Sequence, residues 1–353
     1  MSDAVLDARI ALTRGPLDVD VALTADRGEV IGILGPNGGG KTSTVLALAG
    51  VLPLAEGHVA VNGATWEGAG SRRRLPEQRS VGLMLADALL FPHLRAIDNV
   101  AYGLRSRGAR ARAARARALA ELERVGLADQ ASARSTQLSS GQAARVALAR
   151  ALATDPALLI LDEPLSALDP ETRARTRSDL ARRLGDYDGV TVLVTHDPLD
   201  ALTLADRLVF IEAGVVTQVG TPAEVLREPR TPYVATVVGL NLYAAQSDSH
   251  GILTLASDAT LVTSDPTPGK VWATISPHAV VLHRERPEGS ARNAWPLRVT
   301  DVTLQGQSAR VSLTGALDLI AEVTLASVAA LGIHVGTGLW ASVKATEVVT
   351  YPR

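Results

Sequence analysis

A glycine-rich segment that ends in a lysine and a threonine is the first part of the chain with the residue types for chemistry. Successive glycines let backbone N–H groups turn inward around a phosphate, at the positive end of a following helix. The lysine of such a P-loop reaches the β and γ phosphates of a nucleotide, and the threonine hydroxyl is placed for Mg²⁺. Because the segment lies between an expected strand and an expected helix, it predicts a site for ATP and Mg²⁺. Its residues are Gly35, Pro36, Asn37, Gly38, Gly39, Gly40, Lys41, Thr42 and Ser43.

Two carboxylates follow an apolar run further along the chain. Asp162 and Glu163 come directly after residues 158–161, and the ends of such strands are where α/β sheets bind ligands. We expect Asp162 to contact Mg²⁺ through water, and Glu163 to orient or deprotonate an attacking water. The alternative, a carboxylate pair that caps a helix before Pro164, is disfavoured because a P-loop requires such a partner.

The segment Leu138-Ser139-Ser140-Gly141-Gln142 precedes a helical run. A hydroxyl, a glycine and a helix N-terminus form a second phosphate-binding set. With the P-loop before it and the carboxylates after it, this order resembles the ABC ATPase family over residues 1 to about 235. The resemblance implies that Ser139 and the backbone at Gly141, together with Gln142, contact ATP held by the P-loop of a second copy. Two copies would therefore enclose two ATP molecules.

Two further positions match that family. Asp169 ends a segment similar to the D-loop, which crosses the dimer interface. His196 ends the apolar run 190–196 and is similar to the switch histidine, which contacts the γ-phosphate. The resemblance thus implies that Lys41, Glu163 and His196 are the catalytic residues.

The sequence departs from the family at three places. Ala86, followed by Asp87, occupies the position of a glutamine that contacts Mg²⁺ and senses the transport partner. Ser140 replaces a glycine of the signature, which is a mild change if its φ is negative. No aromatic residue precedes Trp66, so we hypothesise that Arg14 stacks on the adenine instead.

The pattern of apolar residues indicates the elements that position these groups. Short apolar runs alternate with helical segments, which predicts an α/β ATPase domain over residues 1–235. Its P-loop (RecA-like) core would carry a helical subdomain at about 87–150. Residues 105–126 are strongly helical in composition. The six arginines between 105 and 117 are interpreted as a solvated helix face, because no aromatic interleaves them.

Residues 236–353 differ in character. Short segments of alternating polarity are separated by turn residues, which predicts a small, β-rich OB/TOBE-like barrel with a regulatory role. The segments 290–293, 323–327 and 343–346 resemble the molybdate-binding Mop domain, which would span about 288–352. A tetrahedral dianion is bound by cations, hydroxyls and N–H groups without carboxylates. The candidate oxyanion residues are Ser290, Arg292, Ser327, Lys344 and Ala345.

These resemblances imply the ATPase subunit of a molybdate or tungstate importer. Such a subunit would bind membrane permease subunits at the cytoplasmic face of the cell membrane. Through them it would serve an extracytoplasmic substrate-binding protein. The closest alternative is a subunit of a sulfate, iron, polyamine or sugar importer. A more remote one is a soluble ABC ATPase without a role in transport.

Composition sets outer bounds on these hypotheses. A chain of 353 residues is too long for one ordinary core, so two domains are expected. The formal net charge of −2 gives no global field for nucleic acid. The absence of cysteine excludes a disulfide framework and a thiolate zinc site. No apolar stretch approaches the ~20 residues that span a bilayer, so we expect another chain to hold this one at the membrane.

Overall fold

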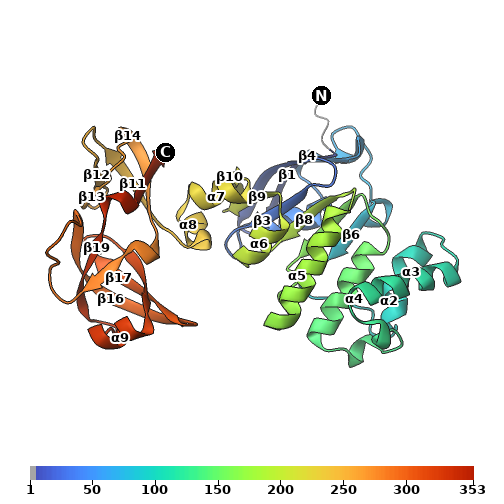
Figure 1. Ribbon diagram of the computed structural model, residues 1–353. Helices are drawn as coiled ribbons and strands as arrows, with labels where there is room; N and C mark the ends of the chain where they lie inside the picture. Colours follow the sequence, from blue (N-terminus) through green and yellow to red (C-terminus); the bar gives the residue numbers. More distant parts are fainter. Residues whose placement is uncertain (1–4) are drawn as a thin grey trace. The chain divides into compact units, whose positions relative to one another are not determined.

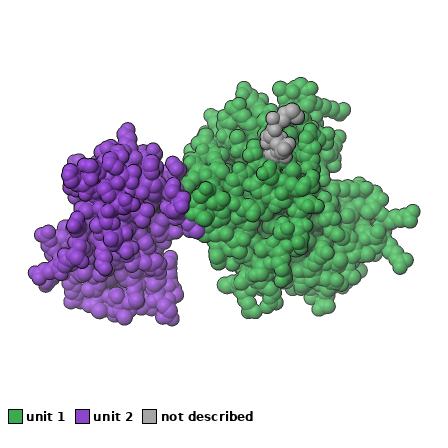
Figure 2. Space-filling model, turned by 45° about the horizontal axis from the view of Figure 1, so that its top comes forward, with its two compact units in different colours: residues 1–225 green, residues 226–353 purple. Residues whose placement is uncertain are grey.

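The computed structural model describes residues 5–353. The chain divides into two compact units, residues 1–225 and residues 226–353 (Figure 2). The strands of the first unit are β1 (Leu6–Arg14), β2 (Leu17–Ala25), β3 (Val30–Leu34), β4 (Glu56–Val61), β5 (Ala64–Gly68), β6 (Val81–Met84), β7 (Leu158–Asp162), β8 (Val190–Val194), β9 (Arg207–Glu212) and β10 (Val215–Gly220). The helices that follow or separate them are α1 (Lys41–Leu48), α2 (Ala96–Ser106), α3 (Ala111–Arg124), α4 (Ser140–Leu152), α5 (Pro170–Gly185), α6 (Pro198–Leu204) and α7 (Pro222–Arg227).

The strands of the first unit form one mixed sheet in the order β5-β4-β1-β2-β10-β9-β3-β8-β7-β6. Neighbours from β9 through β3, β8 and β7 to β6 are parallel, which confirms the predicted α/β class. β3, β7 and β8 are buried along their whole length, as expected for parallel strands covered on both faces. The antiparallel pairing of β1 with β2 and β4 was not predicted.

Helices α2, α3 and α4 gather beside β6 at one edge of this sheet (Figure 1). They share a separate apolar cluster, so they form the expected helical subdomain. The helical run expected at 105–126 is two helices, because the chain turns at Gly108, where φ is +89°. Arg115 on α3 pairs with Asp98 on α2 at 2.9 Å, in agreement with an ordinary exposed helix face.

The second unit contains two five-stranded sheets, in the orders β13-β12-β11-β14-β20 and β15-β19-β16-β17-β18. Apolar residues from both sheets form one core, and the β-rich tail is thereby confirmed. Its strands are β11 (Asn241–Ser247), β12 (Ile252–Leu255), β13 (Thr260–Val262), β14 (Gly269–Ile275), β15 (Val281–His283), β16 (Asn293–Gln305), β17 (Ser308–Gly315), β18 (Leu319–Thr324), β19 (Gly338–Val343) and β20 (Val348–Pro352). Its helices are α8 (Pro232–Val238), α9 (Leu325–Leu331) and the 3₁₀ turns η4 (Pro277–Ala279) and η5 (Ala345–Glu347).

Candidate nucleotide site

The P-loop joins β3 to α1 and passes through positions that only glycine fits. A Cβ atom at Gly35 would lie 2.0 Å from the carbonyl oxygen of Ile211, and one at Gly39 would lie 2.8 Å from the same oxygen. Gly40, with φ of +109°, precedes α1 and gives the helix no side-chain cap. Because the first N–H groups of a helix have no partners within it, this end of α1 suits an anion.

Lys41 begins α1, and its side chain is buried. Its Nζ donates to the carbonyl oxygens of Gly35 at 2.8 Å and of Pro36 at 2.9 Å. Burial lowers the pKa of the Lys41 amine, while the charges of Glu163 and Asp162 act in the opposite direction. The ammonium therefore spans the loop, where phosphate oxygens can replace the two carbonyl oxygens as its partners.

The P-loop and the end of β7 line one pocket of about 440 Å³. The predicted residues on this pocket are Asn37, Gly38, Gly39, Gly40, Lys41, Thr42, Ser43, Asp162 and Glu163. The hydroxyl of Thr42 and the carboxylate of Asp162 are oxygen ligands of the kind Mg²⁺ prefers. Among residues 5–353 no three His, Cys, Asp or Glu side chains are grouped to hold a metal. Water molecules and phosphate oxygens would supply the other ligands of a magnesium ion here.

Burial raises the pKa of Asp162, and the neighbouring charge of Glu163 raises it further. The charge of Lys41 acts in the opposite direction. A carboxyl in such surroundings gains from a nearby cation, because the cation favours its ionised form. The site thus fits Mg²⁺ by its donor atoms and by its electrostatics.

Glu163 and His196 contact each other, which the sequence did not predict. The Nδ1 atom of His196 lies 3.0 Å from Oε1 of Glu163. Glu163 has a φ of +51°, and its backbone N–H donates to Val194 at 2.8 Å. Asp162 and Val194 are partners on the parallel strands β7 and β8, so the two strands end at the same level. The two apolar runs 158–161 and 190–194 have similar lengths, and pairing them end to end would have predicted the contact.

The signature residues lie at the start of α4. Ser139 caps this helix: its Oγ accepts from the Gln142 N–H at 3.2 Å, and Gln142 Oε1 accepts from the Ser139 N–H at 2.9 Å. A Cβ atom at Gly141 would lie 3.1 Å from Cδ2 of Leu168, so the signature packs on the D-loop segment. Asp169 caps α5 through the Thr172 N–H.

None of Ser139, Gly141, Gln142 and Asp169 lines the pocket around Lys41. Within the described part of one chain, the two candidate phosphate-binding sets are therefore separate. Ser140 is the first residue of α4, and its φ is not positive. Serine adopts this backbone conformation without strain, so the replacement of glycine is mild.

The structure also places the residues at which the chain departs from the family. Arg14 lines the pocket and donates to Ser43 Oγ at 3.4 Å, and stacking of its guanidinium on adenine stays a prediction. Ala86 and Asp87 are exposed and follow β6, whose Met84 pairs with Leu161. Ala86 and Asp87 thus lie past the carboxyl end of β6, on the same side of the sheet as the carboxylates at the end of β7.

Comparisons with known proteins agree with this geometry. Residues 19–166 match a family model described as ABC transporter, and residues 289–349 match the TOBE domain. The chain is 39% identical to the molybdenum import ATP-binding protein ModC of Mycobacterium tuberculosis, over 100% of this chain and 98% of the relative. The chain belongs to the ABC transporter family.

Other relatives in the ABC transporter family differ in their named substrates. The Fe(3+) ions import ATP-binding protein FbpC 2 of Rhizobium meliloti is 33% identical, over 95% of this chain and 87% of the relative. Sulfate/thiosulfate and spermidine/putrescine import ATP-binding proteins also match.

A solved structure of the ATP-binding cassette MJ0796, a dimer bound to ADP and Pi, covers 62% of this chain and 98% of that chain. Its TM-score is 0.56 at 28% identity. The chain is therefore an ABC importer ATPase, which binds ATP and couples ATP hydrolysis to import. No helix among residues 5–353 has both the length and the apolar composition needed to cross a membrane.

The candidate oxyanion residues occupy two distant parts of the second unit. Arg292 and Lys344 directly flank the paired residues Asn293 and Val343 on β16 and β19. Ser290 lies two residues before Arg292, and Ala345 begins η5. Ser327 lies in α9, which follows β18, and its hydroxyl lies 2.9 Å from Oγ1 of Thr324. Thr324 pairs with Ser308, which pairs with Gln305 at the other end of β16. One copy of the tail therefore does not bring all five together.

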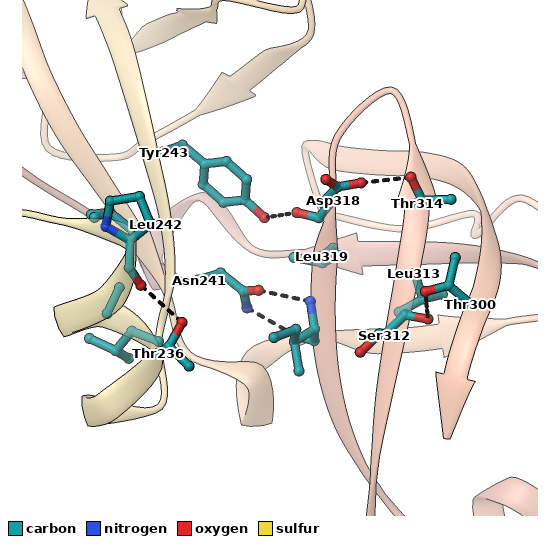
Figure 3. Close-up of a pocket in the computed structure, with 14 residues that line it drawn as sticks. Thr236, Asn241, Leu242, Tyr243, Thr300, Ser312, Leu313, Thr314, Asp318 and Leu319 are labelled. Carbon is teal, nitrogen blue, oxygen red and sulfur yellow. Dashed lines mark hydrogen bonds between the residues drawn. The ribbon is translucent and has the colours of Figure 1, made fainter. Parts of the chain in front are cut away.

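The second unit also contains a pocket of about 460 Å³ beside α8, β11, β17 and β18 (Figure 3). The Tyr243 hydroxyl donates to the Asp318 carbonyl oxygen at 2.7 Å, and Thr314 donates to the Asp318 carboxylate at 2.6 Å. Neither arginine nor lysine lines this pocket. A carboxylate without a cation disfavours a dianion, so the pocket is not an alternative oxyanion site.

Proposed function

We propose that this ABC importer ATPase energises uptake of molybdate or tungstate and binds the oxyanion in its tail. The observation that carries the proposal is the position of Arg292 and Lys344, which directly flank the paired strand residues Asn293 and Val343. Neither has a carboxylate partner within 4.0 Å among the described residues. The full-length similarity to a molybdenum import ATPase supports the same substrate.

The alternative substrate is sulfate, because it has the same charge as molybdate and a sulfate/thiosulfate import relative matches 83% of the chain. Sulfate is the smaller oxyanion, so selectivity would depend on hydrogen-bond distances and not on charge. Iron, polyamine and sugar import remain more remote, since two unpaired cations favour an anion over a metal ion or an amine.

We propose that a second copy of the chain completes each ATP site. The P-loop of one copy binds the phosphates through backbone N–H groups and Lys41, and Ser139 and Gly141 of the other copy contact the γ-phosphate. Mg²⁺, held by Thr42, Asp162 and phosphate oxygens, would neutralise phosphate charge. Glu163 accepts the proton of the attacking water. His196 orients the Glu163 carboxylate through its ring nitrogen.

A groove of about 470 Å³ between β6 and helices α2 and α4 is the proposed docking surface for a membrane permease subunit. Leu89 and Tyr102 on this groove are 63% and 49% exposed, although both are large and apolar. The Tyr102 ring packs on Phe91 at 4.5 Å between centroids, and Arg107 adds positive charge. A permease segment with apolar and acidic side chains fits these groups. This contact would hold the chain at the cytoplasmic face of the membrane, where it would serve an extracytoplasmic substrate-binding protein.

Titration calorimetry of the full chain with molybdate, tungstate and sulfate tests the substrate. We expect micromolar binding of molybdate or tungstate, which corresponds to about −8 kcal/mol. Arg292→Ala combined with Lys344→Ala should abolish it and leave basal ATPase activity intact. Arg298→Ala is the matched control, because Arg298 is an exposed arginine of the same sheet that donates to Gly336. Absence of heat with all three anions would contradict an oxyanion site in the tail.

A further inference from the structure

The segment 86–91 connects the sheet to the proposed permease groove and contains a strained residue. Leu89 has a φ of +42°, and its side chain points to solvent with 63% exposure. A leucine with positive φ is a genuine backbone outlier, because its Cβ atom crowds the following carbonyl oxygen. Such strain persists only where surrounding contacts impose it. Those contacts are therefore informative.

The contacts come from Arg150 on α4. Its Nη1 donates to the carbonyl oxygen of Leu89 at 2.9 Å, and its Nη2 donates to that of Ala88 at 3.0 Å. The guanidinium also lies over the Phe91 ring, at 5.8 Å from the centroid. One side chain thus holds three of the six residues of the segment.

Arg150 has no carboxylate within 4.0 Å in the part of the chain that the structure describes. Burial lowers the pKa of its guanidinium, with no opposing charge nearby. Burying a cation is unfavourable unless its donors are satisfied, and here the carbonyl oxygens of the segment satisfy two of them. Separation would leave the Arg150 guanidinium and the two carbonyl oxygens without these hydrogen bonds. The segment and the helix are therefore expected to move together.

The helix that carries Arg150 begins at the signature. Ser139 caps α4, and Arg150 lies in its last turn. A helix of 13 residues is a rigid rod of about 20 Å, so a displacement at one end is transmitted to the other. We propose that Arg150 is a positioning residue that couples segment 86–91 to the signature end of α4. Movement of the docked permease would thereby reach the phosphate-binding residues Ser139 and Gly141. This inference rests on the proposed function of the groove.

Arg150→Lys is the decisive variant. Lysine keeps the charge but lacks the planar fork that donates to two carbonyl oxygens at once. Arg107→Lys is the matched control, because Arg107 lines the same groove but donates to Thr154 and not to the segment. The chain has no cysteine, so Asp87→Cys gives a single position for a spin label within the segment.

The first measurement is the electron spin resonance line shape of the label at position 87 in the isolated full chain. We expect an immobile label that becomes clearly more mobile with Arg150→Lys and is unchanged with Arg107→Lys. Equal mobility in all three proteins would overturn the role of Arg150.

The second measurement is ATPase activity of the unlabelled chain, alone and reconstituted with its permease subunits in lipid discs. Arg150→Lys should lower the permease-stimulated rate about tenfold and change the basal rate less than twofold. Loss of fold alone would lower both rates together. Normal stimulation of Arg150→Lys would refute the coupling. If the wild-type chain shows no stimulation, the proposed transport function fails, while the spin-label result still decides whether Arg150 holds the segment.

Discussion

Replacement of Arg79 should destabilise the P-loop helix from its far end. The Arg79 side chain is fully buried and donates to the carbonyl oxygens of Ala47 at 2.9 Å and Leu48 at 2.8 Å, both in the last turn of α1. It also pairs with Glu67 at 2.5 Å. Burial lowers the pKa of Arg79, and the bond to Glu67 opposes that shift. The Arg79 guanidinium thus donates to carbonyl oxygens at the C-terminal end of α1. Lys41 lies at the N-terminal end of the same helix.

The expected magnitude follows from these contacts. Arg79→Met leaves the buried Glu67 carboxylate with only the longer ion pair to Arg73, at 3.4 Å, and breaking a buried ion pair costs about 3–5 kcal/mol of unfolding free energy. Adding Glu67→Gln removes the stranded charge and keeps an oxygen that accepts from the Leu54 N–H, now at 2.9 Å. The double variant should therefore be more stable than Arg79→Met alone by about 2 kcal/mol.

Urea unfolding followed by Trp66 fluorescence measures this difference. Trp66 is the single tryptophan before residue 226, and Arg79 lies 5.8 Å from its ring centroid. Variants with Trp272, Trp295 and Trp340 replaced by phenylalanine would isolate its signal. A loss under 1 kcal/mol in Arg79→Met, or strictly additive effects in the double variant, would refute the reasoning.

Three further predictions concern the nucleotide site. Ala86→Gln should lower the Mg²⁺ concentration for half-maximal ATPase activity and raise the permease-stimulated rate, since it restores the amide that would contact Mg²⁺. Glu163→Gln removes the charge that, together with burial, raises the pKa of Asp162, so the acid limit of Mg²⁺-dependent ATP binding should move to lower pH. Gly35→Ala should abolish ATP binding, because its Cβ would lie 2.0 Å from a carbonyl oxygen of β9. Gly63→Ala, with φ of +71° but open space around it, should cost only about 1–2 kcal/mol of stability.

Each of these has a contrary outcome. Unchanged Mg²⁺ dependence in Ala86→Gln would favour Asp87 or a water as the group that has taken over, and Asp87→Ala should then be damaging. If the acid limit of Mg²⁺-dependent ATP binding is unchanged in Glu163→Gln, the charge of Glu163 does not raise the pKa of Asp162. Normal nucleotide affinity in Gly35→Ala would contradict the close approach of the loop to β9.

The nucleotide site was largely predictable because its residues are placed by strand ends and helix starts. Asp162 ends a buried strand and Lys41 begins a helix, so local patterns position both. The Glu163–His196 contact was not predicted, because it depends on the register between β7 and β8. The Arg150 contacts were missed for a similar reason, since they join residues 61 positions apart through backbone carbonyl groups.

The tail was predictable in class but not in arrangement. Segments such as 309–315 alternate in polarity and became strands, whereas β11 to β13 carry no comparable signal. The separation of Ser327 from Arg292 and Lys344 is a consequence of strand pairing along the 13 residues of β16. The order of these residues along the sequence does not predict that separation.

The central claim is that two copies of the chain enclose ATP and that Glu163 activates water there. Sedimentation of Glu163→Gln with saturating ATP and Mg²⁺ tests it most directly. We predict a dimer with hydrolysis about 10²–10⁴-fold slower than wild type, and reversion to monomer when Ser139→Ala is added. A Glu163→Gln protein that stays monomeric with ATP bound, or that hydrolyses ATP at a near-normal rate, would contradict the account.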